Sequence, residues 1–214
     1  MSDLPEAGGA PLRDEGETPA VPRPAATVIL LRRGAKHAER SLEILLVQRN
    51  PEARFMPGVW VFPGGAVDSE DGDGEEAHRV AAARELAEEA GIVVPADVLV
   101  AYSRWITPRV APIRFDTRFY LGLAPAHSPP EPDGSETVDA GWFGPQDALD
   151  MHHAGELPLV FPTIKHLEQL AEFGSVADAI ETARGREVQP VQPRVVVEGD
   201  SARVVLPGEP GYDD

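Results

Sequence analysis

The residues best suited to chemistry lie in one short segment, RELAEEAG, at positions 84–91. On a helix that turns about 100° per residue, Glu85, Glu88 and Glu89 share one stripe. Such like-charged neighbours repel one another by roughly 0.2–0.5 kcal/mol per exposed pair, and by more when partly buried. A divalent cation would reverse the sign of that interaction, and ligands that are all oxygen atoms favour Mg²⁺ or Mn²⁺ over zinc. The spacing fits either a metal site or a solvated acidic face.

Two neighbouring features favour the metal site. Pro63, Gly64 and Gly65 stand where a strand should end, shortly before the helix, and glycine allows a backbone to approach a ligand closely. Arg84 precedes Glu85, where its guanidinium could orient a carboxylate or neutralise the acidic cluster. Together, the glycine turn and the arginine shift the interpretation towards a functional site.

The elements that position this site follow from the hydrophobic pattern. Runs rich in branched aliphatic and aromatic residues predict strands at 25–33, 44–49, 59–62, 97–107, 114–124 and 139–143. The acidic helix is expected to begin with a capping box of Asp73 and Glu76 and to stop at Gly91. Further helices are expected at 145–153, 162–174 and 175–184. Strands and helices interleave without a strict rhythm, which favours an α/β fold with a mixed β-sheet.

The 214 residues suffice for one substantial domain with extensions. Residues 1–24 are rich in proline, glycine, alanine and acidic residues, so we expect a disordered N-terminal tail. The domain is expected over residues 25–184. Residues 185–214 form a C-terminal extension, in which we expect a small hairpin that turns at Gly199 and Asp200.

Composition excludes several classes of partner. The formal net charge is −17, from 36 acidic and 19 basic residues, and such a field repels nucleic acid and anionic membrane surfaces. No apolar run approaches the roughly 20 residues that a membrane span needs. The absence of cysteine excludes disulfides and thiolate zinc sites. We therefore expect a cytoplasmic protein that binds neither nucleic acid nor a membrane.

The segment from Gly65 to Ile92 resembles the signature of the Nudix hydrolases. That signature is a glycine, five residues, a glutamate, seven residues, and then Arg-Glu, an aliphatic residue, any residue, Glu-Glu, any residue, glycine and an aliphatic residue. The match includes Glu76, Arg84, Glu85, Glu88, Glu89, Gly91 and Ile92. One departure is that ten residues, 66–75, separate Gly65 from Glu76, so a loop should bulge before the helix. Glu76 is then either a catalytic group or a helix cap.

Further segments are similar to the branch of this family that contains a peroxisomal coenzyme A diphosphatase and its bacterial relatives. They are FMPGVWVFPGGAVDSED, RWITP, RFDTRFYL, GWFGPQDAL and LPLVFPTIKHLEQLAEF. The resemblance implies a Nudix-type α/β/α sandwich with a mixed β-sheet. It also implies a metal-dependent hydrolase that cleaves the pyrophosphate of a nucleoside diphosphate derivative, with coenzyme A or acyl-coenzyme A as the favoured substrate.

The resemblance also implies roles for individual residues. The expected ligands of Mg²⁺ or Mn²⁺ are Gly65, through its carbonyl, and Glu85, Glu88 and Glu89. The expected catalytic residues are Arg84, Glu85, Glu88 and Glu136. Arg84 would orient the carboxylates, and Glu136 is the candidate base from a later loop, since family members take the base either from the signature or from such a loop. Substrate phosphates need cationic partners in so acidic a protein, and Arg49 and Arg104 are the expected ones.

Alternatives to a coenzyme A diphosphatase stay open. An enzyme of the same class could act on ADP-ribose or a dinucleotide, or the chain could be a non-catalytic Nudix module that senses a nucleotide. The complete set of Arg84, Glu85, Glu88 and Glu89 argues against the sensing module. A site that had lost its catalytic activity would have no physical reason to keep three acidic side chains so close together. Nudix relatives are often dimers, so the resemblance is compatible with a homodimer, although no apolar stripe in the sequence marks an interface.

Overall fold

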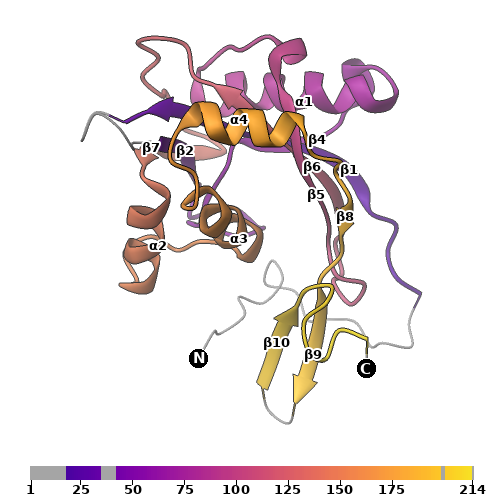
Figure 1. Ribbon diagram of the computed structural model, residues 1–214. Coiled ribbons are helices and arrows are strands. Elements are labelled where there is room, and N and C mark those ends of the chain that lie inside the picture. The colour runs from indigo at the N-terminus through magenta and orange to yellow at the C-terminus, as the bar shows by residue number, and fades with distance from the viewer. Residues whose placement is uncertain (1–17, 35–41, 199–200, 214) are drawn as a thin grey trace.

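The computed structural model describes residues 18–34, 42–198 and 201–213 (Figure 1). Its strands are β1 (Arg23–Arg33), β2 (Leu42–Arg49), β3 (Trp60–Val61), β4 (Gly64–Ala66), β5 (Val100–Ile106), β6 (Phe115–Leu123), β7 (Thr137–Phe143), β8 (Pro190–Val191), β9 (Arg194–Glu198) and β10 (Ser201–Val205). Its helices are α1 (Gly74–Ala90), α2 (Pro145–His153), α3 (Phe161–Leu170) and α4 (Val176–Arg184). Two short 3-10 turns are η2 (Ser69–Asp71) and η3 (Ala96–Val98).

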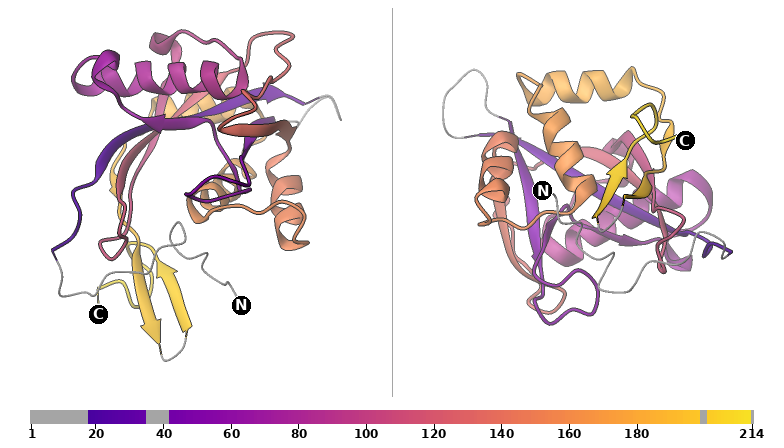
Figure 2. Two further views of the ribbon diagram at one scale, coloured as in Figure 1. Left: turned by 180° about the vertical axis from the view of Figure 1, so that it is seen from behind. Right: turned by 90° about the horizontal axis from the view of Figure 1, so that it is seen from below.

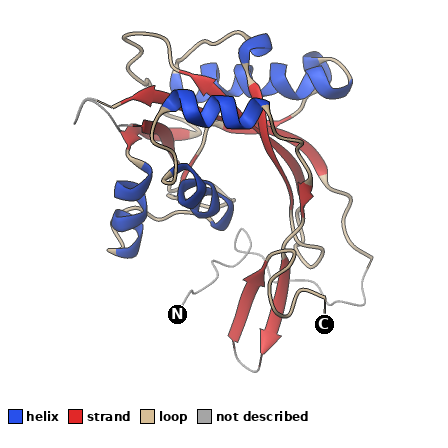
Figure 3. Cartoon of the chain, viewed as in Figure 1, coloured by secondary structure: helices blue, strands red, loops and turns tan. Residues whose placement is uncertain are grey.

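A mixed sheet forms the middle layer, with strand order β3-β2-β1-β6-β5-β8. In addition, β4 pairs with β1 and β7 pairs with β2. The central strand β1 runs parallel to β6 and antiparallel to β2 and β4. Residues 25–31 of β1 are all buried, because helices cover both faces of the sheet. In Figures 2 and 3, α1 lies on one face and α4 on the other, with the strands between them.

Alternate side chains of β1 enter two separate cores. Val28 and Leu30 pack with Leu86 of α1, while Ile29 and Leu31 pack on the opposite face with the apolar side chains of α2, α3 and α4. The helix α1 contributes small side chains to its core, Ala81, Ala82 and Ala90 among them. These alanines let the helix lie close to the sheet, so the acidic stripe of α1 is carried next to β4.

The termini of α1 differ in how well the sequence predicts them. Gly91 ends the helix as expected, with a φ of +66° and its N–H donating to the carbonyl of Ala87 at 3.1 Å. The expected capping box is wrong. Asp73 occupies the N-cap position, but its side chain accepts no capping hydrogen bond, and Glu76 instead lies 3.7 Å from Arg79. The reason is local, because Gly74, the first residue of the helix, has a φ of +72°, which lies outside the range of an ordinary helix start.

The described part of the chain includes residues 18–24, which belong to the expected N-terminal tail. Arg23 already belongs to β1, and its N–H donates to the carbonyl of Arg114 at 2.9 Å. The Arg114 guanidinium donates in turn to the carbonyl of Ala20 at 2.8 Å. Residues 1–17 of the expected tail lie outside the described residues. So does the expected turn at Gly199 and Asp200, although β9 and β10 on either side of it pair antiparallel.

His166 of α3 is a core residue. Its ring lies 4.3 Å from that of Phe119, measured between centroids, and its Nε2 is 2.6 Å from the hydroxyl of Ser103. Burial lowers the pKa of His166 to about 3, so its side chain is neutral at ordinary pH. Among the described helices, none is both long enough and apolar enough to cross a membrane.

Candidate active site

The glycine turn and the acidic helix meet directly. The N–H of Gly64 donates to Glu89 Oε2 at 2.9 Å, which joins β4 to the last turn of α1. A Cβ placed on Gly65 would lie 2.3 Å from Glu85 Oε1, so only glycine leaves room for that carboxylate. Glu85 and Glu89, one turn apart on the helix, therefore face the same glycine pair.

Glu89 is buried, and Glu85 is partly buried with its side chain 13% exposed. Glu89 is 3% exposed, and burial raises its pKa to about 7. Burial also raises the pKa of Glu85, against the opposing effect of Arg84. The charges of the two groups act on each other, since Glu85 further raises the pKa of Glu89. Two neighbouring carboxylates that have lost most of their water are costly to keep ionised unless cations accompany them. A divalent ion relieves this arrangement of charge.

Arg84 organises the acidic cluster. Its Nη1 lies 2.9 Å from both Glu85 Oε1 and Glu88 Oε2, and its Nη2 donates to the carbonyl of Ala66 at 3.1 Å. Hydrogen bonds to Asp71, and then to Glu85 and Glu88, raise the pKa of Arg84, so the guanidinium is a permanent cation. Glu88 has a side chain that is 57% exposed and turned towards Arg84. Within the described part of the chain, no three acidic or histidine side chains are grouped as ligands of one ion.

Asp71 is a site residue that sequence reasoning missed. It belongs to η2 in the long loop before α1, and its side chain is only 2% exposed. Both of its carboxylate oxygens accept from Arg84 at 3.0 Å, and one also accepts from the N–H of Asp68 at 2.8 Å. The hydrogen bonds from Arg84 hold the pKa of Asp71 below its usual range. The sequence shows Asp71 as one acid among several, and only the turn of η2 directs it inward.

We expect the change Arg84→Met to lower the free energy of unfolding by roughly 2 kcal/mol, because it leaves the buried Asp71 carboxylate without its cation. Urea unfolding with a chelator present measures this change. The double variant with Asp71→Asn should cost less than the two single changes added together, since the asparagine carries no charge to compensate. Strictly additive costs would show that Asp71 does not depend on Arg84.

The loop that carries Glu136 is fixed to the same helix. Asp133 accepts hydrogen bonds from the N–H groups of Ser135, Glu136 and Thr137, which shapes the turn. Thr137 Oγ1 donates to the carbonyl of Glu89 at 2.7 Å. The charge of Glu136 raises the pKa of both Glu85 and Glu89, so its carboxylate lies within electrostatic reach of them. The fold thus brings Glu136 close to Glu85 and Glu89, although Glu136 follows Glu89 by 47 positions in the sequence.

The two arginines expected to bind substrate lie in different places. Arg49, at the end of β2, lines a pocket together with Gly64, and its charge lowers the pKa of Glu89. Arg104 instead pairs with Asp116 through two hydrogen bonds of 2.8 and 2.6 Å. Arg104 is not among the residues that line the pocket, whereas the next three residues, Trp105, Ile106 and Thr107, do line it. The structure brings Arg49 to the carboxylates and engages Arg104 elsewhere.

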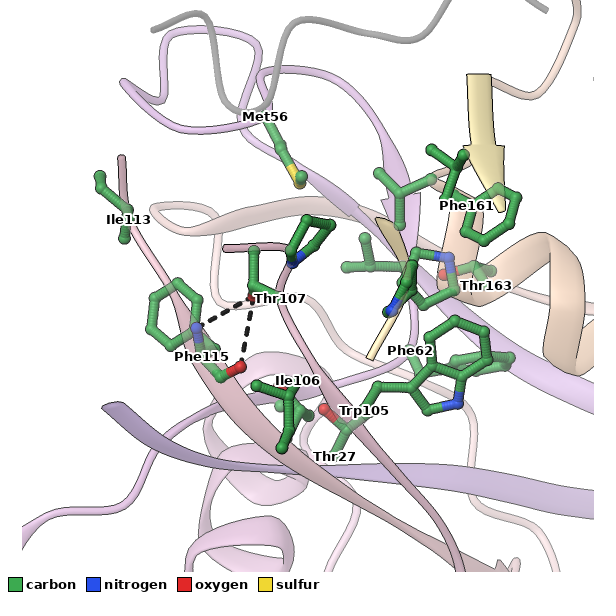
Figure 4. Close-up of a pocket in the computed structure, with 18 of the residues that line it drawn as sticks. Thr27, Met56, Phe62, Trp105, Ile106, Thr107, Ile113, Phe115, Phe161 and Thr163 are labelled. Atoms are coloured by element: carbon green, nitrogen blue, oxygen red, sulfur yellow. Dashed lines mark hydrogen bonds between the residues drawn. The ribbon is translucent and has the colours of Figure 1, made fainter. Parts of the chain in front are cut away.

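A pocket of about 500 Å³ opens beside the glycine turn (Figure 4). This volume lies within the range of roughly 300–1,000 Å³ that small-molecule sites occupy. Its lining is mostly apolar, and the aromatic members are Phe55, Phe62, Trp105, Phe115, Phe119 and Phe161. Thr107 and Phe115 join its strand walls through hydrogen bonds at 2.9 and 3.0 Å. Of the described residues in this lining, Arg49 is the one that is charged, and the others are mostly apolar.

Comparison with known proteins gives consistent matches. The model of the NUDIX domain matches residues 21–161. Putative nudix hydrolase 7 of Caenorhabditis elegans is 29% identical over 185 residues, which cover 70% of this chain and 61% of that protein. Acyl-coenzyme A diphosphatase NUDT19 of Homo sapiens is 30% identical over 116 residues, which cover 52% of this chain and 31% of that protein. The alignments thus cover less than two thirds of either relative's length.

Among solved structures, a NUDIX hydrolase from Alicyclobacillus acidocaldarius superposes with a TM-score of 0.67 at 29% identity. The match covers 75% of this chain and 96% of that one. The arrangement of sheet and helices described above is therefore shared with an experimentally determined structure over most of its length.

Proposed function

The chain belongs to the Nudix hydrolase family, and on that premise we propose that it hydrolyses the pyrophosphate of a nucleoside diphosphate derivative. The family resemblance and the α/β fold with a mixed sheet, both expected from the sequence, are confirmed by the domain match and the structural relative. Coenzyme A or acyl-coenzyme A is the substrate that we favour. The observation that carries the proposal is the pair of carboxylates against the glycine turn, the buried Glu89 and the partly buried Glu85.

These residues suit a hard divalent cation such as Mg²⁺ or Mn²⁺. Glu85, Glu89 and the carbonyl of Gly65 would hold it, with Glu88 as a further ligand once it leaves Arg84. All of these donors are oxygen atoms, and the carboxylates carry the charge that such ions prefer. When bound, the ion would offset negative charge on the attacking and leaving oxygens of the diphosphate.

The remaining residues are assigned by position. Arg49, beside Gly64 in the pocket, would bind a phosphate oxygen. Glu136 would accept a proton from the attacking water. The water oxygen would form a bond to phosphorus while the bridging P–O bond breaks. The electron pair of the broken bond would leave with the departing phosphate. Arg84 is a positioning residue, because its contacts are with Asp71 and the carboxylates. Arg104 also stays a candidate for phosphate binding, but only if substrate displaces Asp116 from it.

Two observations support coenzyme A or its thioesters over ADP-ribose and dinucleotides. The human relative is named as an acyl-coenzyme A diphosphatase. The pocket next to the carboxylates is largely apolar, which suits a substituent less polar than ribose or a second nucleotide. A small-molecule substrate is the class of partner that we propose, while a homodimer, a cytoplasmic location and the absence of nucleic-acid binding stay predictions.

A panel of diphosphates tests the proposal. The purified chain is incubated with coenzyme A, acyl-coenzyme A, ADP-ribose and a dinucleoside polyphosphate, each with Mg²⁺, Mn²⁺ or a chelator. Release of 3′,5′-ADP from coenzyme A in the presence of metal is the expected result, whereas preferential release of AMP from ADP-ribose would move the assignment to that substrate. Tight nucleotide binding without turnover under any condition would identify a sensing module instead of an enzyme.

A further inference from the structure

The C-terminal hairpin, β9 and β10, forms one wall of the pocket that begins at the glycine turn. Val195 of β9 and Ala202 and Val204 of β10 line this pocket together with Gly64 and Arg49. All three lie beyond residue 161, where the matched NUDIX domain ends. The site is therefore built partly from a segment outside the domain that identifies the family.

The hairpin is attached to the sheet at a defined place. β8, just before it, pairs in parallel with β5, with Val191 opposite Trp105. Gln192 accepts a hydrogen bond from the Tyr212 hydroxyl at 2.8 Å through its carbonyl, which ties the last described turn back to the start of the hairpin. At the other end, Val205 is only 1% exposed. In both side views of the molecule, β9 and β10 extend beyond the end of β5 (Figures 1 and 2).

Pairing fixes which hairpin side chains face the pocket. Val204 lies opposite Val195 across the two strands, and Ala202 lies two positions from Val204, so these three share one face. Arg203, between Ala202 and Val204, points to the other face and donates to the carbonyl of Pro210 at 3.1 Å. The wall that the hairpin gives to the pocket is accordingly made of small aliphatic groups.

We propose that this hairpin selects substrates in which the group attached to the diphosphate carries an aliphatic chain. The inference rests on the proposed function, which places the diphosphate beside Gly64 and Arg49. A chain extending from there passes the aromatic floor of the sheet and meets Val195, Ala202 and Val204. Each methylene that the pocket buries is then worth roughly fourfold in affinity, until the cavity is full.

The matched pair Ala202→Trp and Arg203→Trp tests this inference. Both add the same ring to adjacent positions of β10, one on the pocket face and one on the opposite face. The measured quantity is the ratio of kcat/KM for a straight-chain acyl-coenzyme A, such as the dodecanoyl thioester, to that for unacylated coenzyme A. We expect Ala202→Trp to lower this ratio at least tenfold and Arg203→Trp to leave it as in the unmodified chain.

A third variant guards against a displaced hairpin. Val204→Thr nearly keeps the side-chain volume and replaces one methyl group by a hydroxyl, so it should lower the same ratio several-fold without filling the pocket. If the unmodified chain cleaves no diphosphate at all, the proposed function fails. If it cleaves them and the ratio is the same for the unmodified chain, Ala202→Trp and Val204→Thr, the hairpin plays no part in selection and this inference is overturned.

Discussion

The substitution Glu89→Gln is expected to lower turnover by about a thousandfold, or about 4 kcal/mol of transition-state stabilisation, without unfolding the protein. Glutamine has the volume of glutamate, and its carbonyl oxygen can still accept the hydrogen bond from the N–H of Gly64. What it loses is the negative charge that a divalent cation needs. Because burial already raises the pKa of Glu89 to about 7, a neutral side chain is well tolerated at this position.

The experiment compares kcat of Glu89→Gln with that of the unmodified chain, on the best substrate of the panel and at saturating Mg²⁺. Unfolding by urea, followed in parallel, should give a midpoint close to that of the unmodified chain. Glu181→Gln is the matched control, since this glutamate lies on α4 with its side chain 82% exposed. Undiminished turnover in Glu89→Gln would remove Glu89 from the site and with it the main support for the assignment.

The change Gly65→Ala should reduce turnover by about a hundredfold and leave stability nearly unchanged. The new Cβ would lie between 2.3 and 2.7 Å from the three terminal carboxylate atoms of Glu85. These atoms are the mobile end of a long side chain, so Glu85 can move away while the backbone stays in place. The predicted cost therefore falls on the position of the carboxylate and not on the fold.

Gly64→Ala provides the contrast. A Cβ at this neighbouring position would lie 2.5 Å from the carbonyl oxygen of Ala26 and 2.7 Å from the Cα of Thr27. Both atoms belong to the backbone of β1, so the pairing of β4 with β1 has to shift and the midpoint of thermal unfolding should fall. Measuring kcat and the unfolding midpoint for both variants separates the two effects. Wild-type kcat in Gly65→Ala would mean that Glu85 is not needed where the structure places it.

The sequence predicts those parts of the fold that depend on local pattern. The helix at 145–153 agrees with α2 in both bounds, and α1 stops at Gly91 as expected, because both follow from the types of residue within a few positions. The capping box was predicted wrongly because it depends on the backbone conformation of Gly74. The spacing of Asp73 and Glu76 does not reveal that Gly74 has a positive φ.

The composition of the candidate site could not be predicted from local sequence patterns, because it depends on contacts between distant parts of the chain. Arg104 and Trp105 are adjacent, and which of them faces the pocket depends on a shift of register in β5 between Ala101 and Ser103. The pocket itself gathers residues from Thr27 to Val204, so no window of sequence contains it. The acidic stripe of α1 was visible because helical periodicity alone brings its members together.

The ion pair between Asp71 and Arg84 gives a purpose to the extra length before α1. Ten residues separate Gly65 from Glu76, whereas the family signature has five residues at this place. From the sequence alone, the extra residues resemble a dispensable insertion. A deletion that included Asp71 would remove the anchor that holds Arg84 against Glu85 and Glu88. A transplant of α1 to another scaffold would therefore need η2 as well, because the loop and the helix share this ion pair.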